Sequence, residues 1–424
     1  MSAQITTMPN GLRVVSKTVK SVETVSLGVW VHVGARQEPA TWNGISHLLE
    51  HMAFKGTISR SAQQIAEQIE AVGGYMNAYT SREATAYYVR VLRQDIRLGA
   101  DVIADILRNS IFDGEELAKE KTVVLQEIGQ SYDTPDDIIF DHFQATAFPH
   151  QPLGRAILGT SEIVTSITPD DLKAYMGKEY HPSRMVLAAA GNIEHEELVA
   201  LAQEFLNNEW QIGGHTFAPT DIAPATYQGG CYLEDKSLEQ VHVVLGFAGV
   251  PITDKRFHQM MVASTILGGG MSSRLFQEIR EKRGLVYSIY SHASSYRDTG
   301  LLSIYAGTSP NDVIELIPVI FDELHKLAQN VTITEINRAK AQLKASLMMG
   351  LESMPSQCEQ LANHTLNFGA PIAAPEILAR IDAVTPDMVT SIIETTLRSK
   401  PTAAVLGSLQ KLHGSRESLS LIGA

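Results

Sequence analysis

The feature that most constrains the fold of this chain is an internal repeat. Signals for the start of a helix or a strand recur at offsets of 217 to 219 residues. The matching pairs are Thr168-Pro169-Asp170 with Thr385-Pro386-Asp387, Pro182 with Pro401, and Glu115-Glu116-Leu117 with Thr334-Glu335-Ile336. Three matches at nearly one offset indicate a duplication with about 200 residues in each copy, so the chain should fold as two similar halves.

A stretch without periodicity separates the two copies. Residues 209–230 are rich in Gly, Pro and Thr, which is typical of a linker. We therefore expect an N-terminal domain at 1–210, a linker at 211–228 and a C-terminal domain at 229–424. Within each half, strand-like segments come in pairs ahead of groups of helices and do not alternate with them. This order predicts an α+β fold in which each half is a mostly antiparallel sheet with helices packed on one face.

The segment Gly44–Thr57 carries the motif HxxEH. His47 and His51 stand four residues apart, so on a helix both imidazoles lie on one face and can reach a single ion. Glu50 precedes the second histidine and would lie beside that ion, where a carboxylate can hold a water. The apolar residues between them predict an amphipathic helix, but they do not account for a glutamate beside two histidines at ligand spacing. The motif therefore predicts a metal site.

A catalytic zinc site needs a third protein ligand and leaves a fourth position open for water. The candidate is Glu127, on a predicted helix at 115–132. Glu120 lies seven residues earlier on the same face and could accept the free ring N–H of a ligating histidine. In the second half, the equivalent helix carries a lone His258, and the position that matches Glu127 falls near 344–346. The sequence thus predicts that the first half alone binds the metal.

Together, these residues resemble the pitrilysin and mitochondrial processing peptidase family, whose members are inverzincin zinc peptidases. The resemblance covers essentially the whole chain, and the length suits the short, two-domain members of bacterial processing-peptidase type. Four further segments match the family: GGYMNAYTSREATAYY at Gly73–Tyr88, FPHQPLGRAILGT at Phe148–Thr160, YHPSRMVLAAAGNI at Tyr180–Ile193 and SSRLFQEIREKRGLVYSIYS at Ser272–Ser291. The resemblance implies one Zn²⁺ per chain, held by His47, His51 and Glu127.

The resemblance also assigns a role to Arg280 and Tyr287, which stand seven residues apart in the second half. They are similar to the family's arginine–tyrosine pair, which hydrogen-bonds the substrate carbonyl and its oxyanion. In short members of the family, a partner subunit supplies this pair. Because this chain carries both the metal ligands and the pair, we expect a homodimer in which each active site is completed in trans.

Four residues of the first half are expected to contact substrate. Phe54 resembles the family's apolar contact for the residue just after the cut. Asn77, Ala78 and Thr80 are expected on an exposed edge strand, to which an extended peptide can add through main-chain hydrogen bonds. Such binding gives affinity without strict reading of the peptide sequence.

We interpret the chain as a zinc-dependent endopeptidase that hydrolyses peptides or short unfolded polypeptides inside a cavity formed by a dimer. Glu50 would take a proton from the attacking water and later pass it to the leaving amine. Two other classes stay open at this point. Some relatives are non-catalytic scaffolds or partner subunits of larger complexes, although their metal motifs are usually broken. A zinc hydrolase for a non-peptide amide or ester would use the same ligands.

The composition narrows the partners further. A net charge of −13 argues against nucleic acid, because phosphate binding needs a basic surface. Two cysteines without a CxxC spacing indicate neither a disulfide framework nor a thiolate metal site. No apolar run approaches the ~20 residues that span a bilayer, and the N-terminal residues do not have the pattern of a secretory signal. We expect a cytoplasmic protein without a membrane partner.

Overall fold

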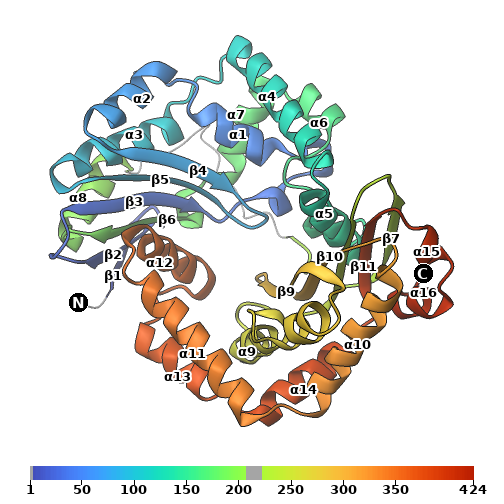
Figure 1. Ribbon diagram of the computed structural model, residues 1–424. Helices are drawn as coiled ribbons and strands as arrows, with labels where there is room; N and C mark the ends of the chain where they lie inside the picture. The colour runs from blue at the N-terminus through green and yellow to red at the C-terminus, as the bar shows by residue number, and fades with distance from the viewer. Residues whose placement is uncertain (1–2, 207–221) are drawn as a thin grey trace. The chain divides into compact units, whose positions relative to one another are not determined.

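The computed structural model describes residues 3–206 and 222–424. These residues form two compact units, each built around one sheet (Figure 1). The first unit takes its residues from 1–129, 155–222 and 348–373, and the second from 130–154, 223–347 and 374–424. The α+β architecture with two largely antiparallel sheets confirms the predicted fold class. Residues 211–221 of the expected linker lie outside the described residues.

The first sheet has six strands in the order β1-β2-β6-β3-β5-β4. Its neighbouring strands are antiparallel except for β2 and β6, which run parallel. The strands are β1 (Gln4–Thr7), β2 (Arg13–Thr18), β3 (Thr24–Val31), β4 (Tyr75–Thr80), β5 (Thr85–Leu92) and β6 (Met185–Gly191). β4 pairs with β5 alone, so it is an open edge of this sheet, as predicted.

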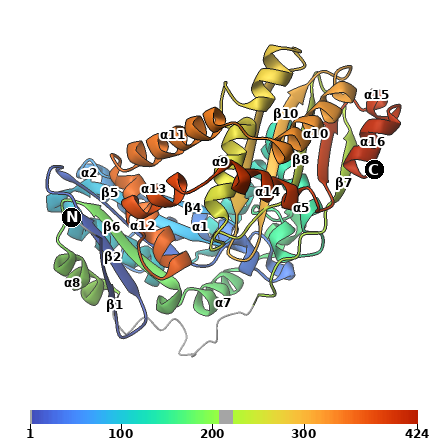
Figure 2. The ribbon, with the colours of Figure 1, turned by 90° about the horizontal axis from the view of Figure 1, so that it is seen from below.

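Helices cover both faces of the first sheet. Most of them pack on the face that Leu27, Val29 and Val31 of β3 present to the main core. These helices are α1 (Ile45–Ala53), α2 (Ala62–Ala71), α3 (Ile96–Arg108), α4 (Gly114–Tyr132), α6 (Ser161–Ser166), α7 (Pro169–Glu179) and α8 (His195–Phe205). On the opposite face, Trp30 packs with residues of α12 (Met354–Phe368), and Figure 2 shows α8 and α12 on opposite sides of β2 and β6.

The second sheet has five strands in the order β7-β11-β8-β10-β9. β7 and β11 run parallel, and the other neighbours are antiparallel. The strands are β7 (Gly230–Asp235), β8 (Val241–Ala248), β9 (Val286–Ser295), β10 (Gly300–Thr308) and β11 (Thr402–Gly407). The helices of this half are α9 (Phe257–Gly268), α10 (Val313–Gln329), α11 (Ile333–Gly350), α13 (Ala374–Asp382), α14 (Pro386–Thr396), α15 (Gln410–His413) and α16 (Arg416–Ile422).

The two halves exchange a helix. In the second unit, α5 (Pro135–Ala147), which precedes the linker, packs on β11 and β8 through Ile139 and Phe143. In the first unit, α12, which comes late in the sequence, packs on β6 and β3. The compact units therefore differ from the expected domains 1–210 and 229–424, because each half of the sequence contributes one helix to the other unit.

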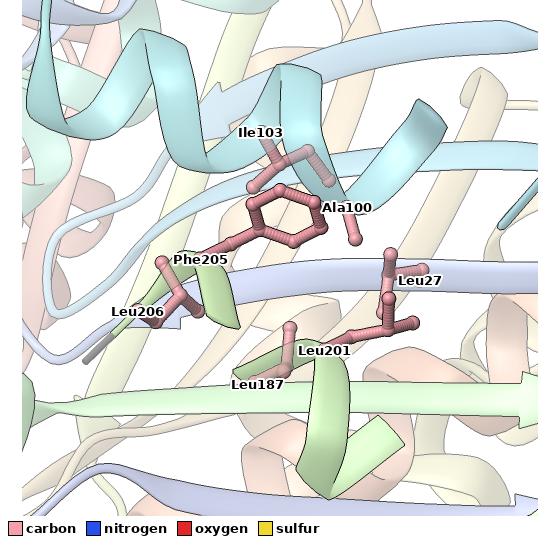
Figure 3. A pocket seen from close by; sticks show the side chains of 7 residues that line it. All are labelled: Leu27, Ala100, Ile103, Leu187, Leu201, Phe205 and Leu206. Atoms are coloured by element: carbon pink, nitrogen blue, oxygen red, sulfur yellow. The ribbon is translucent and has the colours of Figure 1, made fainter. Parts of the chain in front are cut away.

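A small pocket lies between α3, α8, β3 and β6 of the first unit (Figure 3). Its lining is entirely apolar and consists of Leu27, Ala100, Ile103, Leu187, Leu201, Phe205 and Leu206. A cavity of this kind offers water no polar partner and stays dry. It is a packing gap in the core and carries no group that could bind or hydrolyse a peptide.

Candidate metal centre

The metal-binding motif lies on α1, whose apolar residues fix the direction of its polar face. Leu48, Leu49 and Met52 are buried in the first core, so the histidines point away from it. The rings of His47 and His51 lie 4.6 Å apart between centroids, nearly edge to face. The predicted placement of both imidazoles on one helical face is confirmed.

Glu38 fixes the start of α1, and sequence reasoning missed this residue. Its buried carboxylate accepts hydrogen bonds from the backbone N–H groups of Gly44 and Ser46, at 2.8 and 2.9 Å, and from the amide of Asn43 at 2.9 Å. A carboxylate at a helix N-terminus satisfies donors that have no partner within the helix. Burial raises the pKa of Glu38 to about 7, and these hydrogen bonds keep it from rising further.

Glu127 comes from α4 and meets both histidines. Its Oε2 lies 3.6 Å from His47 Nε2 and 3.7 Å from His51 Nε2. One donor atom from each of these three residues lies within 4.8 Å of the other two. Two ligands bound to a tetrahedral zinc at about 2.0–2.1 Å are about 3.4 Å apart, so the spacing and the donor types both fit this ion.

Glu120 supports one of the two histidines. His51 Nδ1 lies 3.0 Å from Glu120 Oε2, and Lys55 Nζ lies 2.7 Å from Glu120 Oε1. Burial alone would raise the pKa of Glu120, but the bonds to Lys55 and His51 lower it overall. With its Nδ1 proton donated to a carboxylate, His51 presents the Nε2 lone pair toward Glu127, as a metal ligand must. The second missed residue, Lys55, follows the end of α1.

The surroundings of His47 differ from those of His51. Burial, together with the adjacent His51, lowers the pKa of His47 to about 4, so the ring is neutral at pH 7 and can donate a lone pair. Its Nδ1 is buried and has no hydrogen-bond partner among the described residues. His47 therefore lacks the carboxylate support that Glu120 gives to His51.

Glu50 lies on the same helix and is held by a strand. Thr80 Oγ1, at the end of β4, donates a hydrogen bond of 2.6 Å to Glu50 Oε2. Burial raises the pKa of Glu50, and the bond from Thr80 acts in the opposite direction. A carboxylate whose pKa is moved toward neutrality beside three metal-type donors is suited to accept and return a proton.

The other residues expected to contact substrate lie near this group. Phe54 follows α1 directly and packs partly buried against the core, with its ring 6.5 Å from that of Tyr87. On the edge strand β4, Asn77 Oδ1 accepts a hydrogen bond from the backbone N–H of Ala78 at 2.8 Å, and Asn77 Nδ2 donates to the Tyr75 hydroxyl. That N–H is thus directed away from β5, on the side where an added strand would lie. Their contact with a peptide stays a prediction.

Arg280 and Tyr287 belong to the second unit. The Arg280 guanidinium carbon lies 5.6 Å from the centroid of the Tyr287 ring, so the two side chains are neighbours. Elsewhere in the second half, α9 carries His258, which joins no group of three possible ligands within the described residues. The three residues that could bind a metal ion, His47, His51 and Glu127, therefore all belong to the first unit.

Two family models match this chain and together span most of it. The model described as insulinase (peptidase family M16) matches residues 13–161, and the one described as the peptidase M16 inactive domain matches residues 166–343. The first of these matches includes α1 and α4, which carry the three metal-type donors. The second match includes Arg280 and Tyr287 but none of the three possible metal ligands.

Relatives of similar length match over nearly the whole chain. A Streptomyces coelicolor protein named as an uncharacterized zinc protease is 40% identical over 418 residues, which cover 97% of this chain and 91% of the relative. A Bacillus subtilis protein with the same description is 39% identical over 387 residues, 91% of this chain and 93% of the relative. A protease from Helicobacter pylori shares the fold, with a TM-score of 0.89 at 21% identity over 96% of this chain and 99% of that one.

In the part of the chain that the structure describes, no helix combines the length and the hydrophobicity needed to cross a bilayer.

Proposed function

The chain belongs to the insulinase family of peptidases, peptidase family M16, and we propose that it is a zinc-dependent endopeptidase that cleaves peptides or short unfolded polypeptides. Membership confirms the family predicted from the motifs. The observation that carries the proposal is the convergence of His47, His51 and Glu127 from two helices, with Glu50 beside them. A non-catalytic scaffold would not need this donor set, and an intact set therefore favours an enzyme.

The residues divide the chemistry among them. Zinc bound by His47, His51 and Glu127 would polarise the scissile carbonyl and lower the pKa of a water to about 7. Glu50 accepts the proton of the attacking water and then gives it to the leaving amine, which breaks the C–N bond and restores the carboxylate. A peptide can add to the open edge of β4, which supplies main-chain groups for an extended backbone. This edge favours peptide over a small amide or ester.

The arginine–tyrosine pair completes the proposed site. A guanidinium and a phenol can donate to the negative oxygen that forms on the scissile carbonyl. We propose that Arg280 and Tyr287 do so and that the chain works as a homodimer, because one chain carries both the metal donors and the pair.

The experiment loads the purified protein with zinc and incubates it with a mixed peptide library, and mass spectrometry then identifies the cut sites. Glu50→Gln should keep the metal and lose cleavage, because the amide cannot take a proton. His51→Ala should lose the metal itself, as measured by elemental analysis. Full activity of the Glu50→Gln protein would refute the proposed mechanism, and cleavage of small esters with no cut peptide would favour the rival hydrolase.

A further inference from the structure

Within residues 3–206 and 222–424, Arg280 is an unpaired cation in a segment whose other basic residues are paired. Among the described residues, its side chain has no hydrogen bond and no ion pair. The nearby basic residues each have a glutamate: Arg274 with Glu335, Lys282 with Glu278, and Arg283 with Glu315. All the N–H groups of Arg280 are therefore available to an outside acceptor.

Both members of the arginine–tyrosine pair lie at irregular points of the backbone. Phe276–Glu281, which includes Arg280, forms a π-helix, and the N–H of Lys282 bonds to the carbonyl of Gln277 five residues earlier. π-Helical turns are rare in proteins, and many of those that occur lie at functional sites. No pattern in the sequence indicates this wider turn.

Tyr287 is the extra residue of a β-bulge. Ser288 pairs with Gly307 and Val286 pairs with Thr308, so Tyr287 has no partner on β10. A bulge turns a side chain out of the regular alternation of a strand. Tyr287 is accordingly 78% exposed, although both of its neighbours on β9 are at least partly covered.

Two aromatic rings hold the Arg280 side chain in place. Its guanidinium carbon lies over the Phe276 ring at 4.6 Å from the centroid and over the Tyr287 ring at 5.6 Å. A guanidinium within about 6 Å of a ring centroid is attracted by the electrons of the ring face. Ring contacts restrict the side chain without using its N–H donors, whereas an ion pair would occupy them.

We propose that Phe276 is a positioning residue, which holds the Arg280 guanidinium beside Tyr287 with its donors free for the substrate oxygen. The inference rests on the proposed function, because binding the substrate oxygen requires that the N–H donors of Arg280 are not taken up by a carboxylate. Phe276 acts through Arg280 and does not itself need to touch substrate. Its ring is partly exposed, so replacing it should not disturb the core.

The kinetic test uses the full chain loaded with zinc and a quenched fluorescent peptide that the wild-type protein cleaves. Phe276→Leu should lower kcat/KM about 2- to 10-fold, and Phe276→Tyr, which keeps the ring, should restore most of it. In an Arg280→Gln background, Phe276→Leu should cause no further loss. The control is Phe368→Leu, which removes an exposed ring on α12 and should leave kcat/KM unchanged.

A second readout does not depend on activity. This readout is the NMR signal of the Arg280 Nε–H group in protein labelled with ¹⁵N-arginine, and its absence in Arg280→Gln assigns it. The ring face should shift this signal upfield, and Phe276→Leu should move it downfield. If the wild-type protein cleaves no peptide, the proposed function fails while this signal still decides the contact. The inference is overturned if the signal does not move, if Phe276→Leu has wild-type kcat/KM, or if its loss persists undiminished without Arg280.

Discussion

The hydroxyl of Thr80 donates a 2.6 Å hydrogen bond to Glu50 Oε2, which ties the end of the edge strand β4 to the proposed proton acceptor on α1. Thr80→Val removes the donor but keeps the side-chain shape, so Glu50 is left free to rotate. We expect kcat to fall about 10-fold, with KM within about 2-fold and metal content unchanged. Thr80→Ser keeps the hydroxyl and should retain most of the activity. A loss in Thr80→Ser as large as that in Thr80→Val would contradict the role of the hydrogen bond, because the serine keeps the donor.

Glu120 should contribute to metal affinity without binding the metal. Glu120→Gln weakens the hydrogen bond from His51 Nδ1 and leaves Lys55 without its counter-charge. We expect zinc affinity to fall about 10- to 100-fold, as is usual when the group behind a histidine ligand is changed. Competition with a chromophoric chelator measures this. Glu116→Gln is the matched control, because Glu116 lies one turn earlier on α4 and pairs with the exposed Lys119; an equal loss there would contradict the assignment.

The proposed homodimer has a direct test in complementation. Glu50→Gln and Arg280→Gln each damage one of the two residue sets that a site needs. If a site takes its donors from one chain and its arginine from the partner, a mixed dimer contains one intact site, and random mixing should restore about a quarter of wild-type activity. If each chain completes its own site, mixing restores nothing. Light scattering of the wild-type protein reports the oligomeric state separately.

The donor set was predictable because helical geometry is local. Residues four and seven apart share a face wherever the helix packs, so the pairs His47 with His51 and Glu120 with Glu127 follow from spacing alone. That the two helices meet was implied only by the resemblance to a known family. Glu38 left no such signal, because it approaches the start of α1 from a loop whose path depends on tertiary packing.

The exchanged helices show a similar limit. The apolar pattern of α5 and α12 indicates which side of each helix is buried, but it does not indicate which sheet covers it. No pattern in the sequence indicated the π-helix around Arg280 or the bulge at Tyr287, since each is a local departure from a regular element. The resemblance to a known family therefore pointed to this pair, but its geometry could not be predicted from the sequence.

Acid should weaken the second unit through Glu335. Burial alone would raise the pKa of this carboxyl, but hydrogen bonds from Arg274 and Thr332 lower it to about 2. A carboxyl with a lowered pKa in the folded state stabilises the protein above its unfolded pKa of about 4.3, and this contribution is lost as the pH falls toward 2. Because the group is partly solvated, we expect Glu335→Gln to cost about 1–2 kcal/mol at pH 7 and progressively less below pH ~4.

Urea unfolding of the wild-type and Glu335→Gln proteins at pH 7, 5 and 3 measures this difference. Glu376→Gln is the control, because Glu376 forms an exposed pair with Arg380 and should change stability by less than about 0.5 kcal/mol at any pH. A cost of Glu335→Gln that stays constant down to pH 3 would mean that the carboxylate charge is not what stabilises the fold.

Two glycines near the metal centre should respond in opposite directions to alanine. Gly159 has φ +75°, and a Cβ there would lie 2.2 Å from the carbonyl oxygen of Asn43, beside Gly44 at the start of α1. Gly159→Ala must push α1 away or distort the backbone, and we expect the free energy of unfolding to fall by about 2–4 kcal/mol together with weaker zinc binding.

Gly129, two residues beyond Glu127 on α4, has open space around its Cβ position. Gly129→Ala should therefore stabilise the protein by about 0.5–1 kcal/mol through helix propensity and leave zinc affinity unchanged. Thermal unfolding without metal, followed by chelator competition, separates the two effects; a Gly159→Ala protein as stable as wild type would show that the backbone contact that sets the start of α1 is absent.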